Sequence, residues 1–234
     1  MREKRTFQQG LKDGLPICLG YLSVSFAFGM NTVLGGLPVW IAVLISMTNV
    51  TSAGQVAGTA LLIAGGNFVE IAMTTFVINL RYMLMSLSLS QKVDQHFHTG
   101  KRLLASFCVT DEIFAVSAAK KGSICFEYFA GLMFLPYVGW AIGTFLGGVA
   151  MGILPTVLQA ALGVALYGMF IAIIIPPARE VRAVALVVVA AAIMSCLLSF
   201  IPNLSSGWSI ILCSVTISVA AAFLFPIREE EDDE

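Results

Sequence analysis

Three polar side chains that could bind a solute interrupt an otherwise apolar stretch, residues 67 to 92: Glu70, Asn79 and Arg81. A charge near the centre of a membrane helix costs ~2.5 to 3.5 kcal/mol, so charges at such positions usually mark a substrate or ion path. On one helix, Glu70 and Arg81 stand about 16 Å apart along the axis, too far to pair with each other. Arg81 therefore either faces a binding site or extends along its helix to carry its charge to the membrane interface.

Polar residues also interrupt two other apolar stretches. They are Ser52, Gly54 and Gln55 within residues 38 to 64, and Asp111 and Glu112 within residues 103 to 119. Non-helical backbone survives at membrane depth only where it lines a cavity or is buried in protein. Transporters place such broken segments, from opposite halves of the fold, around a polar substrate near the membrane midplane.

The second stretch has an ordinary helical interpretation as well. Thr110 is a good N-cap residue, and the negative charges of Asp111 and Glu112 would interact favourably with the positive end of the helix dipole. The positive charges of Lys120 and Lys121 would interact favourably with the negative end of the same dipole. The two interpretations are compatible with each other.

The composition indicates that these residues belong to a membrane protein. Of the 234 residues, 58% are hydrophobic and only 12% are charged, and the mean hydropathy is +0.91. Soluble domains carry about 25% charged residues. Residues 14 to 69 and 183 to 227 contain no Lys, Arg, Asp or Glu. We expect one transmembrane domain over residues 14–227, a cytoplasmic N-terminal segment over 1–13 and an acidic cytoplasmic tail over 228–234.

The apolar runs predict an all-α polytopic fold, since about 20 apolar residues in a helix cross the hydrocarbon layer. Candidate spans are 14–34, 67–91, 124–151, 157–177, 183–201 and 207–225. Lys and Arg mark the cytoplasmic side of short loops. Suppose that segment 38–64 enters and leaves by the outer face of the membrane, and segment 103–119 by the inner face. Every basic cluster and both termini then lie on the cytoplasmic side. This gives about six crossings plus two re-entrant or broken segments, an order compatible with an inverted repeat. The rival is eight or more crossings, with 38–64 split into two thin helices.

Small residues recur at four-residue spacing in one predicted span. Gly139, Gly143 and Gly147 would let a second helix approach closely. The pattern favours packing inside the bundle, and an interface with a partner subunit is the alternative.

The sequence offers little for redox or metal chemistry. Its five cysteines form no C-x-x-C pair, and its two histidines, His96 and His98, share one basic loop without a second ligand cluster. We therefore expect no metal, no cofactor and no enzyme activity. No Gly-rich phosphate-binding loop occurs either.

Several stretches in order resemble the AzlC family, the large subunit of branched-chain amino acid exporters linked to azaleucine resistance. The stretches are residues 7–29, SAGQ at 52–55, FVINLRYMLMSLSLS at 76–90, TDEIFA at 110–115 and WAIGTFLG at 140–147. The resemblance covers most of residues 7 to 200. It implies a secondary exporter of leucine, isoleucine, valine or similar amino acids in a bacterial-type cytoplasmic (inner) membrane. It also implies a small hydrophobic partner subunit of the AzlD type.

The polar residues fit the zwitterion that this resemblance implies. Arg81 would bind the carboxylate bidentately, and a helix N-terminus near Gly54 and Gln55 would add backbone N–H groups. Asp111 and Glu112 would receive the ammonium group. The predicted substrate-binding set is Ser52, Gly54, Gln55, Asn79, Arg81, Asp111 and Glu112. Candidates for an apolar wall are Phe26, Phe28, Met30 and Met83.

Proton coupling needs a carboxylate that can be protonated at depth, and the candidates are Asp111 and Glu70. A protein of another class remains possible on this sequence. The alternative is a channel or a non-transporting membrane subunit that scaffolds a partner.

Overall fold

The computed structural model describes residues 6–95, 97–202 and 204–225, and the regular secondary structure of this part of the chain is helical apart from one isolated bridge between Val93 and Ile124. Among these residues, five helices are long and apolar enough to cross a membrane. They are α1 (Phe7–Leu34), α4 (Phe68–Ser90), α7 (Phe126–Ala150), α9 (Arg182–Ser199) and α10 (Ser206–Leu224). The predicted all-α membrane fold is confirmed.

The helix boundaries follow the predicted spans with two differences. The first helix begins at Phe7, inside the predicted N-terminal segment, where the Thr6 hydroxyl accepts a hydrogen bond from the backbone of Gln9. The predicted span 157–177 forms α8 (Thr156–Glu180), which continues through Pro176 and Pro177. The predicted acidic tail, 228–234, lies outside the described residues.

The first polar stretch forms a helical hairpin that enters and leaves at one end of the bundle. Its two helices, α2 (Val39–Thr48) and α3 (Ser52–Ile63), flank a break at residues 49–51. Gly35, just before the hairpin, lies directly against the side chain of Ile63 at its end. This contact supports the re-entrant interpretation of residues 38–64 over two thin crossings.

The second polar stretch forms a hairpin of the same kind, from α5 (Thr99–Phe107) and α6 (Asp111–Ala119). The Lys92 ammonium before it donates to the backbone carbonyl of Lys120 after it, at 2.9 Å. The Asp94 backbone N–H likewise donates to the Ile124 carbonyl at 3.0 Å. The hairpin therefore enters and leaves at one end, and it begins at Thr99 rather than the predicted residue 103.

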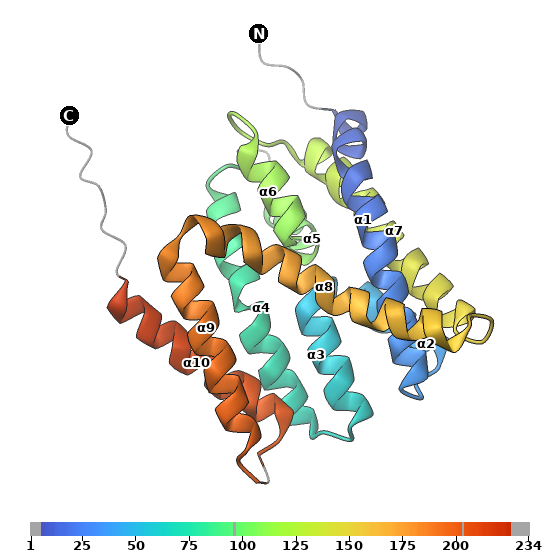
Figure 1. Ribbon diagram of the computed structural model, residues 1–234. Helices are drawn as coiled ribbons and strands as arrows, with labels where there is room; N and C mark the ends of the chain where they lie inside the picture. The colour runs from blue at the N-terminus through green and yellow to red at the C-terminus, as the bar shows by residue number, and fades with distance from the viewer. Residues whose placement is uncertain (1–5, 96, 203, 226–234) are drawn as a thin grey trace.

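The two hairpins enter from opposite ends, because α4 separates them and runs the length of the bundle (Figure 1). A long helix followed by a short hairpin thus occurs twice with opposite sense, once as α1–α2–α3 and once as α4–α5–α6. This order agrees with the inverted arrangement that the sequence predicted. Both hairpins turn back inside the bundle, where their breaks lie near one another.

Helices α1 and α7 pack together along most of their length, and glycine makes the approach possible. An added Cβ at Gly139, Gly143 or Gly147 would collide with Cys18, Ser25 or Phe26 of α1. Within the described part of the chain, the glycine stripe is therefore used for packing inside the bundle, as the sequence favoured.

One end of the bundle, here called the basic end, carries the lysines of the connecting segments. Lys120 pairs with Asp13 of α1 at 2.7 Å, and the Tyr128 hydroxyl of α7 donates to the same carboxylate at 2.7 Å. Lys92 joins this region through the carbonyl of Lys120. The connections that follow α1, α3, α7 and α9 contain no Lys or Arg. They lie at helix ends that point away from the basic end.

Candidate functional site

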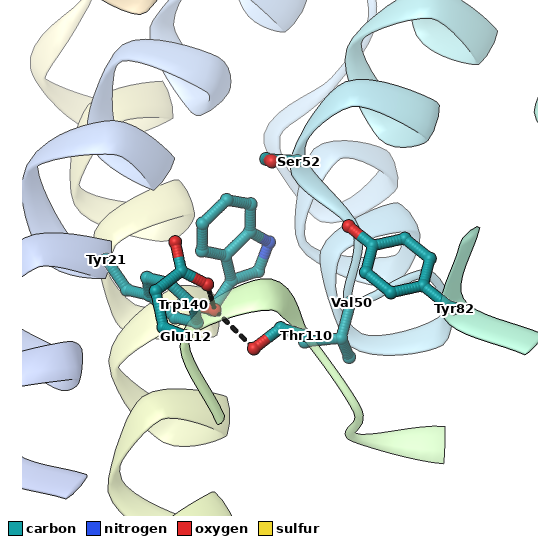
Figure 2. Close-up of a pocket in the computed structure, with 7 residues that line it drawn as sticks. All are labelled: Tyr21, Val50, Ser52, Tyr82, Thr110, Glu112 and Trp140. Atoms are coloured by element: carbon teal, nitrogen blue, oxygen red, sulfur yellow. Dashed lines mark hydrogen bonds between the residues drawn. The ribbon is translucent and has the colours of Figure 1, made fainter. Parts of the chain in front are cut away.

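The breaks of the two hairpins face a small pocket between α1, α4 and α7. Its lining residues are Tyr21, Val50, Ser52, Tyr82, Thr110, Glu112 and Trp140. Figure 2 shows the Thr110 and Glu112 side chains converging on the Tyr21 hydroxyl, with Tyr82 on the other side of the pocket. The pocket is tight, with room for about one water molecule. A larger solute would enter only after side chains or hairpin tips move.

A hydrogen-bonded cluster forms one wall of the pocket. The Tyr21 hydroxyl lies 2.6 Å from the Thr110 hydroxyl and 2.5 Å from a carboxylate oxygen of Glu112. Tyr21 is only 7% exposed, so its hydroxyl has little access to solvent. Thr110 is the N-cap of α6 and accepts from the Ile113 backbone at 3.4 Å. Thr110 thus caps α6 as its sequence position indicates, and Thr110 and Glu112 also line the pocket.

An ion pair joins the second hairpin to α4 beside the pocket. Arg81 Nη2 lies 3.0 Å from Asp111 Oδ2 and also donates to the Tyr82 hydroxyl at 2.8 Å. The two charged side chains are partly exposed, 37% for Arg81 and 24% for Asp111. Asp111 therefore joins Arg81 to the second hairpin, while Tyr82 is a neighbour on α4 itself. The Arg81 Nε is buried and has no hydrogen-bond partner among the described residues.

Gln55 orients an aromatic wall and does not line the pocket, contrary to the direct contact that the sequence predicted. Its side chain is 1% exposed. Its amide oxygen accepts from the Trp140 indole N–H at 3.0 Å, and its amide nitrogen donates to the Ser46 hydroxyl at 2.7 Å. Ser46 in turn contacts the Thr144 hydroxyl at 2.7 Å. This satisfied polar chain fixes the Trp140 ring, which packs edge-on against Tyr21 with ring centroids 4.9 Å apart.

The first hairpin brings its other predicted residues to different places. Ser52 lines the pocket at the first turn of α3. Gly54 is buried, and an added Cβ there would collide with the Asn79 side chain of α4. Gly54 therefore lets α3 approach α4 at this point. The Asn79 Oδ1 atom beside it is buried and has no hydrogen-bond partner among the described residues.

Glu70 lies at the other end of α4, away from the pocket. Its carboxylate accepts hydrogen bonds from the Gly207 backbone N–H at 3.1 Å and from the Ser205 hydroxyl. Glu70 is only 7% exposed. Ser205 is the N-cap of α10. A carboxylate at a helix N-terminus satisfies unpaired N–H groups and favours the positive end of the dipole. This contact gives Glu70 a structural role that its sequence context did not reveal.

Sequence reasoning missed the aromatic part of the site. Tyr21, Tyr82 and Trp140 lie in apolar spans where large side chains are expected, so no local signal marked them. The predicted apolar wall does not line this pocket either. Phe28 and Met30 are buried at 2% and 0% exposure, and Met83 is 61% exposed.

The described residues contain no group of three or more His, Cys, Asp or Glu side chains that could hold a metal ion. The five cysteines form no disulfide; Cys18, Cys196 and Cys213 lie in three different helices, and Cys108 and Cys125 lie at helix ends. His96 lies outside the described residues.

Comparison with known proteins gives consistent matches. Residues 16–154 match the family described as AzlC protein. The chain is 33% identical over 178 residues to the inner membrane protein YgaZ of Escherichia coli (strain K12), covering 73% of this chain and 72% of YgaZ. It is 29% identical over 181 residues to a membrane protein of Archaeoglobus fulgidus, covering 76% of this chain and 79% of that protein. A Helicobacter pylori (strain 26695) membrane protein is 28% identical over 149 residues, covering 60% of this chain and 64% of that protein. No solved structure matches the chain.

Proposed function

The chain belongs to the AzlC family of membrane proteins, and on that premise we propose that it is a secondary transporter that exports branched-chain or similar apolar amino acids. The observation that carries the proposal is the pair of opposed hairpins whose breaks meet at one polar pocket beside the Arg81–Asp111 ion pair. Transporters use this arrangement to expose one site alternately to the two sides of a membrane.

The ion pair suits a zwitterionic substrate. Arg81 and Asp111 satisfy each other at 3.0 Å. A substrate carboxylate can take the place of Asp111 at the guanidinium, while the substrate ammonium takes the place of Arg81 at the carboxylate. Every charge then keeps a partner during the exchange, which avoids the large cost of an unpaired buried charge. Because Arg81 links α4 to α6 through this pair, substrate entry also loosens the second hairpin from α4.

The direct test of export uses whole cells. Cells loaded with labelled leucine should lose it faster when they express this chain together with a small AzlD-type protein. Expression of the Asp111→Asn variant at the same membrane level provides the control. An efflux rate that does not depend on expression of the wild-type chain would contradict the proposal.

The basic end is proposed to face the cytoplasm, because Lys and Arg accumulate on the cytoplasmic side of membrane proteins. On a cysteine-free background, single cysteines placed at Gly36, Gly66 and Ser205 should react with an impermeant reagent from outside. Cysteines placed at Gln95, Gly122 and Glu180 should react only after the membrane is opened. Labelling of positions 36 and 66 from opposite faces would contradict the re-entrant hairpin.

The Trp140 ring is proposed to limit the size of the substrate side chain. Its indole is fixed by Gln55 and forms an aromatic wall of the pocket. Replacing it with leucine should enlarge the pocket and shift the preference from leucine toward phenylalanine by about tenfold, the scale on which hydrophobic pockets discriminate by size. Competition between the two amino acids measures this shift. Trp40→Leu is the matched control, because Trp40 is 66% exposed on α2; equal preferences in Trp140→Leu and wild type would refute the size limit.

A further inference from the structure

We propose that Glu112 is the residue that takes up and releases the coupling proton, an inference that rests on the proposed export function. Glu112 lines the pocket, and its carboxylate contacts the buried Tyr21 hydroxyl at 2.5 Å. The assignment replaces Asp111 and Glu70, the two candidates that the sequence predicted.

The other acidic side chains near the membrane interior already have charged or multiple hydrogen-bond partners. Asp111 is paired with Arg81 at 3.0 Å. Glu70 accepts from the N-terminal backbone of α10. Asp13 is paired with Lys120 at 2.7 Å at the basic end. Each of these carboxylates is therefore already engaged by a cation or by donors at a helix N-terminus.

Glu112 differs from these groups in the partners that face it. From α1 it meets Tyr21, and from its own helix it adjoins Asp111, a like charge. From α4 the nearest ionisable groups are Tyr82, which lines the same pocket, and Arg81, which is engaged with Asp111. Within the described part of the chain, Glu112 makes no ion pair. Glu112 thus faces a neutral hydroxyl and a neighbouring carboxylate, and its carboxylate is not held by a cation from this part of the chain.

The Tyr21 cluster can accommodate both forms without losing a hydrogen bond. Tyr21 has one hydroxyl proton, and it lies within hydrogen-bond distance of both Glu112 and Thr110. When Glu112 is ionised, Tyr21 donates to it and the Thr110 hydroxyl donates to the Tyr21 oxygen. When Glu112 is protonated, it donates to the Tyr21 oxygen and Tyr21 donates to Thr110. Protonation therefore reverses the direction of donation between Glu112, Tyr21 and Thr110 and keeps both hydrogen bonds.

Protonation of Glu112 changes the charge of the site that the substrate ammonium must enter. With Glu112 ionised, Arg81, Asp111 and Glu112 together carry a net charge of −1 by formal count, which attracts the ammonium group to Asp111. With Glu112 protonated, the net charge is zero and this attraction falls. At the separations of neighbouring side chains, one unit charge changes binding by about tenfold. Proton and substrate therefore disfavour each other, and one proton moves inward for each net-neutral zwitterion that moves outward.

The test uses the purified chain, reconstituted with its small AzlD-type partner, and compares wild type with Glu112→Gln. Two quantities are measured: leucine counterflow at equal pH on both sides, and leucine uptake driven by an acid-inside pH gradient. Wild type should show both. Glu112→Gln should keep counterflow, with a Michaelis constant raised about tenfold because the site resembles its protonated form. Its gradient-driven uptake and the pH dependence of its counterflow should be lost.

Two further variants separate a coupling role from a structural one. Glu112→Asp keeps a carboxyl group and should retain gradient-driven uptake. Tyr21→Phe removes the hydrogen bond to Glu112 but keeps the carboxyl group, so gradient-driven uptake should persist. Gradient-driven uptake by Glu112→Gln would overturn the assignment, and so would complete loss of its counterflow, since Glu112 would then be a substrate ligand. Absence of counterflow in wild type would instead contradict the export function itself.

Discussion

Replacing Asp111 with asparagine should lower leucine efflux about 10- to 100-fold while the protein remains at its normal level in the membrane. Asparagine has nearly the same size, so packing at the start of α6 survives. The Arg81 guanidinium, however, loses the carboxylate that lies 3.0 Å away. A hydrogen bond to a charged group contributes about 1.5 to 3 kcal/mol, which corresponds to the expected loss of rate if the same carboxylate must receive the substrate ammonium.

The matched control for this variant is Glu127→Gln. Glu127 also sits in the first turn of a helix, and its side chain is 62% exposed and pairs loosely with Lys101 at 3.8 Å. An exposed pair of this kind contributes little, so efflux should stay at the wild-type rate. If Asp111 serves only as a negative charge at the positive end of the helix dipole, its loss would cost about 0.3 to 1 kcal/mol of local stability. Wild-type efflux in Asp111→Asn would then remove Asp111 from the site.

Replacing Arg81 with lysine should reduce efflux nearly as much as replacing it with alanine. Arg81 uses one guanidinium nitrogen to contact both Asp111 and the Tyr82 hydroxyl, and its remaining N–H groups are available for a carboxylate. Lysine keeps the charge but lacks the planar fork that matches a carboxylate in two parallel hydrogen bonds. Leucine efflux of wild type, Arg81→Lys and Arg81→Ala is compared at matched membrane levels.

The control for the arginine substitution is Arg102→Lys on α5, where the side chain donates to the Phe97 backbone carbonyl at the basic end. A lysine can replace that single hydrogen bond, so efflux should be unchanged. An Arg81→Lys variant that transports like wild type would show that Arg81 needs only its charge. That result would remove the bidentate contact with the substrate carboxylate from the mechanism.

The membrane fold was predictable because its signals are local in the sequence. Uncharged runs mark the long helices, and the position of the basic clusters predicted that both polar stretches return to the side from which they enter. The contacts of Gly35 with Ile63 and of Lys92 with Lys120 agree with that prediction. The start of α5 at Thr99 was missed, since its first turn carries Lys101 and Arg102 and therefore looks like a loop.

The site was only partly predictable because its contacts join distant segments. The sequence singled out Arg81, Asp111 and Glu112, but their spacing could not show that Arg81 pairs with Asp111 or that Glu112 meets Tyr21. Tyr21 lies in α1 and Trp140 in α7, far apart in the sequence. Each looks like an ordinary residue of an apolar span. The contact of Glu70 with Gly207 could not be read from the sequence for the same reason, because Gly207 belongs to the last helix.

Counterflow tests the central claim, that the chain is a carrier of apolar amino acids, most directly. Vesicles containing the purified chain, with and without the small AzlD-type protein, are loaded with unlabelled leucine and diluted into a trace of labelled leucine. A carrier predicts a transient accumulation of label that saturates with substrate, is blocked by isoleucine and valine, and falls in Arg81→Ala. A leak that equilibrates the label without accumulation, or no protein-dependent movement under either condition, would contradict the account.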